Sequence, residues 1–277
     1  MINGLAIWHY PTRTDAQNAA FFADHGFKAV SMLGDSMAKI GRDDALSEEF
    51  ASVIREKNLI LTVHGNLPRS HSDEDVEVFK RDVDSIAKWQ EKYGLIKIFS
   101  FDVWGQIRDN ITPYVEYVFA YKQFGKIALE DFCLTEAEKA QVESFKGDPR
   151  FGHLIDIGHL NVRINGKTTL PFDILRHSDL ECPKTENPGF SAFLQAFRSK
   201  EFPIFEIHLH NNDAVNDLHD FLQVGTADMH DISAVLKEIN YDGIVTIESV
   251  PGMHGYVYPE ADDKILETFE YWKDCVK

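Results

Sequence analysis

Carboxylates and imidazoles stand at or near the ends of several short apolar segments of this chain. Five such side chains are His64, Glu130, Asp156, His208 and Glu248, and His210 follows two residues after His208. Three carboxylates that converge on one place repel one another strongly unless a cation neutralises them. A mixed shell of carboxylate oxygens and imidazole nitrogens with open positions suits Mn²⁺, Mg²⁺, Co²⁺ or Zn²⁺. If the fold brings these residues together, we therefore expect a divalent metal site.

The elements that must position these residues alternate along the chain. Short β-branched or aromatic runs predict strands at residues 4–8, 27–32, 59–64, 95–101, 126–130, 153–157, 203–210 and 243–248. Amphipathic stretches between them predict helices, and residues 161–188 form a loop-like insertion. Parallel strands need crossover helices, and eight such units favour closure. We predict a single (β/α)8 TIM barrel domain over residues 1–277.

The predicted strand ends place the polar side chains at the mouth of this barrel. Catalytic groups of such barrels lie on the face built by the loops that follow the strands. Side chains alternate between the two faces of a strand, so Glu130, Glu206, His208 and His210 are expected to point inward. The same parity directs Glu248 inward and Ile247 toward the helices.

Each of these residues also has an ordinary structural interpretation. A single strand-end glutamate is commonly a salt-bridge partner, and an inward histidine is commonly a hydrogen-bonded core residue. Core packing gives no reason for polar residues at four strand ends, so the joint arrangement favours function. Two more segments, DIGH with His159 and DLH with Asp217 and His219, lie in predicted loops. Their alternative interpretation is a polar surface loop, which for Asp217 alone is the better one.

Composition limits the partners and the compartment. The 277 residues carry 28 basic and 45 acidic side chains, a formal charge of −17. This charge repels polyanions, so no nucleic-acid partner is expected. No segment is long and apolar enough to span a membrane, and the N-terminus does not resemble a signal peptide. The cysteines Cys133, Cys182 and Cys275 are far apart and odd in number, which is typical of a reducing cytoplasm.

The sequence resembles the xylose isomerase-like barrels, the superfamily of sugar isomerases, epimerases and sugar-phosphate isomerases. The segments that carry this resemblance are IALED, LIDIGHLN, IHLHNND, DLHDFLQVGTAD and IVTIESVPG, and it extends over nearly the whole chain. It implies that Glu130, Asp156, His208 and Glu248 hold one divalent metal ion. Either His208 or His210 could be the imidazole ligand, and we favour His208.

The resemblance also implies an activity, which is isomerisation or epimerisation of a small sugar or sugar-like polyol. A metal that chelates a carbonyl and the adjacent hydroxyl makes the C–H between them more acidic. Glu130 and Glu248 are then the acid–base pair that moves the proton through an enediolate. The expected substrate contacts are His64, His159, Trp8 and Trp104, with Phe101 as a further part of an apolar wall. Relatives often pair, so a homodimer is expected.

The sequence also looks like a relative of the type-four apurinic endonucleases, which are zinc-dependent phosphodiesterases with the same barrel. His64, His159, Asp217 and His219 match their extra ligands, so Asp217 and His219 are candidate ligands of a second metal. The fourth predicted strand differs from the pattern of these nucleases, because they have a histidine near its end where this chain has FDVW. A third interpretation is a non-catalytic metabolite-binding barrel. Metal content separates the three interpretations. One ion per chain supports the isomerase, two or three ions support the nuclease, and no ion with a bound sugar supports the binding protein.

Overall fold

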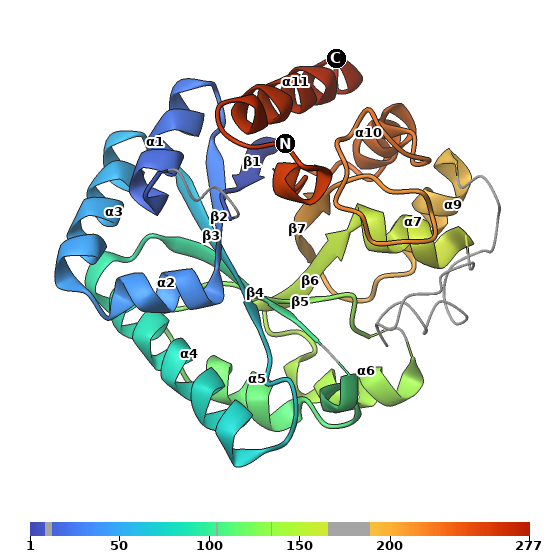
Figure 1. Cartoon of the computed structure of the whole chain (residues 1–277). Coiled ribbons are helices and arrows are strands. Elements are labelled where there is room, and N and C mark those ends of the chain that lie inside the picture. The colour runs from blue at the N-terminus through green and yellow to red at the C-terminus, as the bar shows by residue number, and fades with distance from the viewer. Residues whose placement is uncertain (9–12, 104, 134, 166–188) are drawn as a thin grey trace.

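Eight parallel strands form a closed barrel in a computed structural model that describes residues 1–8, 13–103, 105–133, 135–165 and 189–277 (Figure 1). Each strand pairs with the next one along the chain, and β1 pairs with β8 to close the barrel. The strands are β1 Ile2–Ala6, β2 Ala29–Leu33, β3 Ile60–Asn66, β4 Ile96–Asp102, β5 Ile127–Glu130, β6 Phe151–Asp156, β7 Ile204–Leu209 and β8 Ile244–Ile247. The predicted (β/α)8 barrel is confirmed.

Helices surround this barrel on all sides (Figure 1). They are α1 Asp15–Asp24, α2 Gly34–Gly41, α3 Asp44–Glu56, α4 Asp73–Tyr93, α5 Thr112–Phe119, α6 Glu136–Val142, α7 Ile157–Asn165, α9 Phe190–Arg198, α10 Met229–Glu238 and α11 Glu260–Cys275. Short 3-10 helices occupy Gly105–Asp109, Glu143–Phe145 and Pro251–His254. Within the described ranges, none of the helices has the length and apolar character needed to cross a membrane.

Two helices, α2 and α7, begin directly at the end of a strand. α2 follows β2 directly and packs so closely on β3 that a Cβ on Gly34 would lie 2.8 Å from the Cα of Gly65. α7 begins directly after β6 and covers the first five residues of the predicted 161–188 insertion. Its Leu160 and Ile164, four residues apart on one face, are buried in the core between strands and helices. Residues 166–188 lie outside the described residues.

Inside the barrel, an apolar layer closes the end at which the strands begin. Its buried side chains are Ala29, Ile98, Ala128, Leu154, Phe205 and Ile244. The larger core lies between the strands and the helices. At the seam, the indole N–H of Trp272 on α11 donates to the Asn3 side chain on β1 at 3.2 Å. Because the strand beginnings are filled by hydrophobic side chains, polar chemistry is left to the opposite end of the barrel.

Candidate metal centre

Three side chains from β6, β7 and the end of β8 meet at the mouth of the barrel. Asp156 is the last residue of β6, His208 lies within β7, and Glu248 directly follows β8. One potential ligand atom of each lies within 4.8 Å of the other two, and all three are buried. The Nδ1 atom of His208 is 2.9 Å from Oε2 of Glu248. We call Asp156, His208 and Glu248 the central group.

Glu130, the last residue of β5, adjoins the central group through His208. Ligand atoms of Glu130, His208 and His64 also lie within 4.8 Å of one another. Oε2 of Glu130 is 3.0 Å from Nε2 of His64, and Oδ2 of Asp102 is 3.4 Å from the same nitrogen. The other ring nitrogen of His64 is hydrogen-bonded to the Ser100 hydroxyl at 2.9 Å. His64 is therefore oriented toward two carboxylates.

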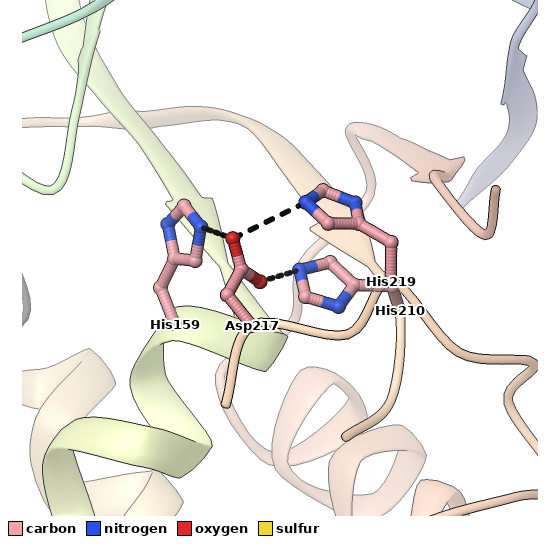
Figure 2. A group of neighbouring side chains, drawn as sticks. All are labelled: His159, His210, Asp217 and His219. Atoms are coloured by element: carbon pink, nitrogen blue, oxygen red, sulfur yellow. Dashed lines mark hydrogen bonds and ion pairs between the residues drawn. The ribbon is translucent and has the colours of Figure 1, made fainter. Parts of the chain in front are cut away.

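A second concentration of imidazoles lies beside the central group. It consists of His159, His210, Asp217 and His219, which we call the four-residue group (Figure 2). Asp217 lies in the middle, with Oδ2 3.3 Å from Nε2 of both His159 and His219, and Oδ1 3.5 Å from Nε2 of His210. The DLH segment is thus brought into the mouth rather than left as a polar surface loop.

The two histidines of the HLH segment belong to different groups. His208 lies in the central group, whereas His210 lies in the four-residue group. His210 also joins the groups, because its Nε2 is 3.0 Å from Oδ1 of Asp156. The sequence alone left either histidine open as the ligand of one ion. In the structure the two side chains face different sets of partners.

The DIGH segment positions its residues through local geometry. The backbone N–H of His159 donates to Oδ1 of Asp156 at 2.7 Å. The carboxylate of the last residue of β6 thus accepts a hydrogen bond from the first turn of α7. Gly158 leaves room for the ring of His210, because a Cβ at this position would lie 1.9 Å from the ring's Cε1 atom. The glycine is thus required by the imidazole that packs over it.

Several buried polar atoms of both groups make no hydrogen bond within the described part of the chain. They are Oδ2 of Asp156, both ring nitrogens of His208, Nε2 of His210 and Oδ1 of Asp217. Nδ1 of His208 and Nε2 of His210 lie at ion-pair distance from carboxylate oxygens but do not have hydrogen-bond geometry. Buried donors and acceptors of this kind are normally satisfied by protein, water or an ion. The set combines carboxylate oxygens with imidazole nitrogens, which is the donor set of a divalent transition metal. The residues present therefore fit a metal.

The electrostatics of the mouth point in the same direction. Burial would lower the pKa of His64, but Asp102 and Glu130 outweigh it and raise this pKa to about 10. Burial would also lower the pKa of His208, but Glu248 and Glu206 raise it above its ordinary value. In the same way, Asp156 and Asp217 raise the pKa of His159. Without a metal, these carboxylates hold protons on the imidazoles. A bound cation would supply the same positive charge and displace those protons.

The carboxylates show the reciprocal effect. Burial would raise the pKa of Glu130, but the imidazoles of His159 and His64 hold this pKa well below its ordinary value. Asp102 differs, because burial and the neighbouring Glu130 raise its pKa to about 7. The imidazoles of the mouth therefore do not neutralise all of its negative carboxylate charge, which favours cation binding.

Three carboxylates near these groups were not predicted as site residues. Asp102 ends β4 beside His64, and Asp131 directly follows Glu130 with a positive φ of 48°. Asp131 contacts Nδ1 of His159 at 2.7 Å and forms an ion pair with buried Arg163. Glu206 lies in β7, one layer below His208. Strand parity directed Glu206 inward without assigning it to the site. The same parity was available for Asp102, which is two residues from the inward Ser100.

The predicted apolar wall is only partly formed by the described residues. The ring of Trp8 lies 5.7 Å from that of His64 and 6.4 Å from that of His208, at the mouth. The prediction for Phe101 is wrong, because this side chain has the outward parity of β4 and packs against Phe79 of α4 at 6.2 Å. Trp104 lies outside the described residues.

Comparisons with known proteins agree with this architecture. A family model described as the xylose isomerase-like TIM barrel matches residues 19–275. No curated protein matches the chain in sequence. Among solved structures, D-psicose 3-epimerase with D-tagatose from Clostridium cellulolyticum H10 is 12% identical, with 100% of both chains covered and a TM-score of 0.64.

Two further solved structures are similar over nearly their full length. The apo form of 3-keto-D-glucoside 4-epimerase from E. coli has a TM-score of 0.66 and 14% identity, covering 99% of this chain and 100% of that one. A probable 3-DHS dehydratase from Bacillus anthracis has a TM-score of 0.65 and 13% identity, with 97% of each chain covered. At these identities the similarity shows the shared fold alone.

Proposed function

Because the chain belongs to the xylose isomerase-like TIM barrel family, we propose that it is a divalent-metal-dependent isomerase or epimerase of a small sugar or sugar-like polyol. The observation that carries this proposal is the central group with Glu130 beside it. Asp156, His208 and Glu248 present ligand atoms within 4.8 Å of one another at the mouth of the barrel. The epimerases among the similar structures support a sugar substrate.

The metal would be held by Asp156, His208 and Glu248, with Glu130 as the fourth ligand. All four are nearly inaccessible to solvent, with 0–4% of their surface exposed. When bound, a divalent ion supplies Lewis-acid polarisation of a carbonyl and its neighbouring hydroxyl. Mn²⁺, Co²⁺, Mg²⁺ and Zn²⁺ all accept this combination of oxygen and nitrogen ligands.

Glu248 and Glu130 would move the proton at the substrate carbon. Both carboxylates adjoin His208 but come from β8 and β5, so they approach the mouth from different strands. Both oxygens of Glu130 contact imidazoles, His159 at 3.1 Å and His64 at 3.0 Å. These contacts keep Glu130 ionised as a base, and Glu248 takes the complementary role. Epimerisation requires both faces of the carbon, whereas a 1,2-shift can be served from one.

His159, His64 and Trp8 would position the substrate. Imidazoles can hydrogen-bond sugar hydroxyls, and the Trp8 ring offers an apolar surface for the carbon chain. The guanidinium groups described near the mouth are engaged in ion pairs: Arg163 with Asp131, and Arg108 with Glu138 at 2.8 Å. An unphosphorylated sugar therefore fits this site better than a sugar phosphate.

The experiment is a screen of ketoses and aldoses in deuterated solvent with metal-loaded protein. We expect one class of sugar to acquire deuterium at a single carbon next to its carbonyl and to be converted to its isomer or epimer. Mass spectrometry and proton NMR measure both changes. If no sugar exchanges hydrogen, while the metal-loaded protein cleaves phosphodiesters, the isomerase assignment is wrong.

A second candidate function is metal-dependent phosphodiester hydrolysis, and the four-residue group favours it. His159, His210, Asp217 and His219 could hold a second ion next to the central group (Figure 2). Paired metal ions are typical of enzymes that displace an oxygen at phosphorus. The charge of −17 disfavours a polyanionic DNA substrate. We therefore rank it second, and the metal count together with the two assays separates the candidates.

A further inference from the structure

A second polar layer lies inside the barrel, directly below the site. Thr62, Glu206 and Thr246 occupy the positions two residues before His64, His208 and Glu248 on β3, β7 and β8. Side chains two residues apart on a strand share a face, so each lies one layer below a residue of the site. All three are completely buried.

Glu206 is the centre of this lower layer. Its Oε1 atom accepts hydrogen bonds from the hydroxyls of Thr62 at 3.0 Å and Thr246 at 2.6 Å. One bond comes from β8, the strand paired with β7, and the other comes from β3, across the barrel interior. Together they fix the carboxylate in position. Its Oε2 atom has no hydrogen-bond partner within the described residues. No guanidinium or ammonium group in the part of the chain that the structure describes pairs with this carboxylate. Burial of a carboxylate without such a partner is costly, which favours a functional role for Glu206.

The nearest imidazole to this carboxylate is His208. Its Nε2 atom is 3.7 Å from Oε1 of Glu206, while its Nδ1 atom is 2.9 Å from Oε2 of Glu248. The ring therefore spans two carboxylates, one in the layer of the site and one in the layer below. A carboxylate behind a metal-bound histidine fixes the ring's tautomer and orientation and increases its basicity as a ligand.

We propose that Glu206 is a positioning residue that holds His208 with its Nε2–H directed down the barrel and its Nδ1 atom directed toward the metal. Thr62 and Thr246 hold the Glu206 carboxylate for this purpose. The inference rests on the metal site of the proposed function, and it does not depend on which substrate is used. It adds a carboxylate below the mouth that takes part in metal binding without being a ligand.

The experiment compares metal binding by the full-length wild type and Glu206→Gln, which removes the charge and keeps the shape. We expect the variant to bind Co²⁺ about 10- to 100-fold more weakly, as is typical when such a supporting group is lost. The visible absorption of the Co²⁺ protein should also shift, which a purely structural role would not cause. Ser31→Ala is the matched control, because Ser31 is equally buried on β2 and its hydroxyl has no hydrogen-bond partner within the described residues.

A measurement on the wild type does not depend on whether the variant folds. Long-range proton–nitrogen NMR of the Zn²⁺ protein reports which nitrogen of His208 carries hydrogen, with assignment by the signal that His208→Gln lacks. We expect hydrogen on Nε2 and metal on Nδ1. Hydrogen on Nδ1, or a Glu206→Gln protein with unchanged Co²⁺ affinity and spectrum, overturns the inference alone. A wild type that binds no metal overturns the proposed function and this inference with it.

Discussion

The rings of His210 and His219 stack with their centroids 4.0 Å apart and their planes inclined by only 15°. His210 directly follows β7, and His219 lies nine residues later in a loop. The loop is held against the barrel by backbone bonds between Asn211 and Asp220 and by the N–H of Val250, which donates to the His219 carbonyl at 2.9 Å. Two imidazoles that stack beside one carboxylate, Asp217, can offer their nitrogens to a shared cation.

The first prediction concerns the proposed acid–base pair. Glu248→Gln keeps the shape of the side chain but cannot accept the substrate proton. We expect the barrel to remain folded and solvent-deuterium exchange to fall by about 10²- to 10⁴-fold, the usual contribution of such a group. Glu260→Gln, an exposed glutamate at the start of α11, is the control. Exchange at the wild-type rate in Glu248→Gln would show that another residue moves the proton.

The second prediction concerns removal of the metal. Chelation should abolish activity, and Mn²⁺ or Co²⁺ should restore it. Loss of a ligand present at a thousand times its Kd removes about 4 kcal/mol of stability, because the ion binds only the folded state. Differential scanning calorimetry with and without the ion measures this loss as a lower Tm. Full activity in rigorously metal-free protein would contradict the Lewis-acid role.

The third prediction tests whether the four-residue group binds its own ion. Asp217→Asn removes the charge at the centre of the group, which touches three imidazoles. If the group holds a second ion, elemental analysis should show one fewer ion per chain than in the wild type. Asp242→Asn, on the loop before β8 and away from the mouth, should leave the count unchanged. An equal count in Asp217→Asn and wild type would restrict metal binding to the central group.

The fourth prediction follows from the close approach at Gly158. Gly158→Ala places a methyl group where the His210 ring lies, so the ring must move. We expect weaker metal binding by the four-residue group, with His208 and the central group still able to bind an ion. Gly252→Ala is a suitable control, because a methyl group there would meet no other part of the described chain within 4 Å, its sequence neighbours aside. A Co²⁺ titration followed by absorbance distinguishes the ion bound by the four-residue group from the ion bound by the central group.

The fifth prediction is a pH dependence that does not involve the site. His153 on β6 is buried against Phe202, and burial, with a contribution from Lys200, lowers the pKa of His153 to about 3. The unfolded chain takes up a proton near pH 6.5 and the folded chain does not. This residue's contribution to stability is therefore complete above pH 6.5 and is lost as the pH falls from 6.5 toward 3.

Urea denaturation measures this loss. Between pH 7 and pH 5, His153 should account for about 2 kcal/mol of the fall in the free energy of unfolding. His153→Gln should show a correspondingly smaller fall over the same range, whereas His25→Gln, at an exposed position, should behave like the wild type. Identical pH dependence in His153→Gln and the wild type would mean that the imidazole is protonated in the folded state.

Local pattern was sufficient to predict the barrel and the part of its mouth that faces inward. Strand-forming runs, helical periodicity and the order of elements depend on neighbouring residues, and these are read directly from the chain. Strand parity likewise placed Glu130, His208 and Glu248 on the inner face, and Asp156 was predicted at a strand end. α7 was missed because it starts without a separating loop, on the carboxylate of Asp156.

The division of the mouth into groups was decided only by the tertiary structure. His208 and His210 share one parity in the sequence, but His210 lies just past the end of β7 and faces Asp217 and Asp156 instead of Glu248. Asp102, Asp131 and Glu206 gain their roles from partners 28 to 38 residues away or from the layer above them. Periodicity specifies which face a side chain takes, whereas distances between strands depend on barrel closure and on how the loops pack over its end.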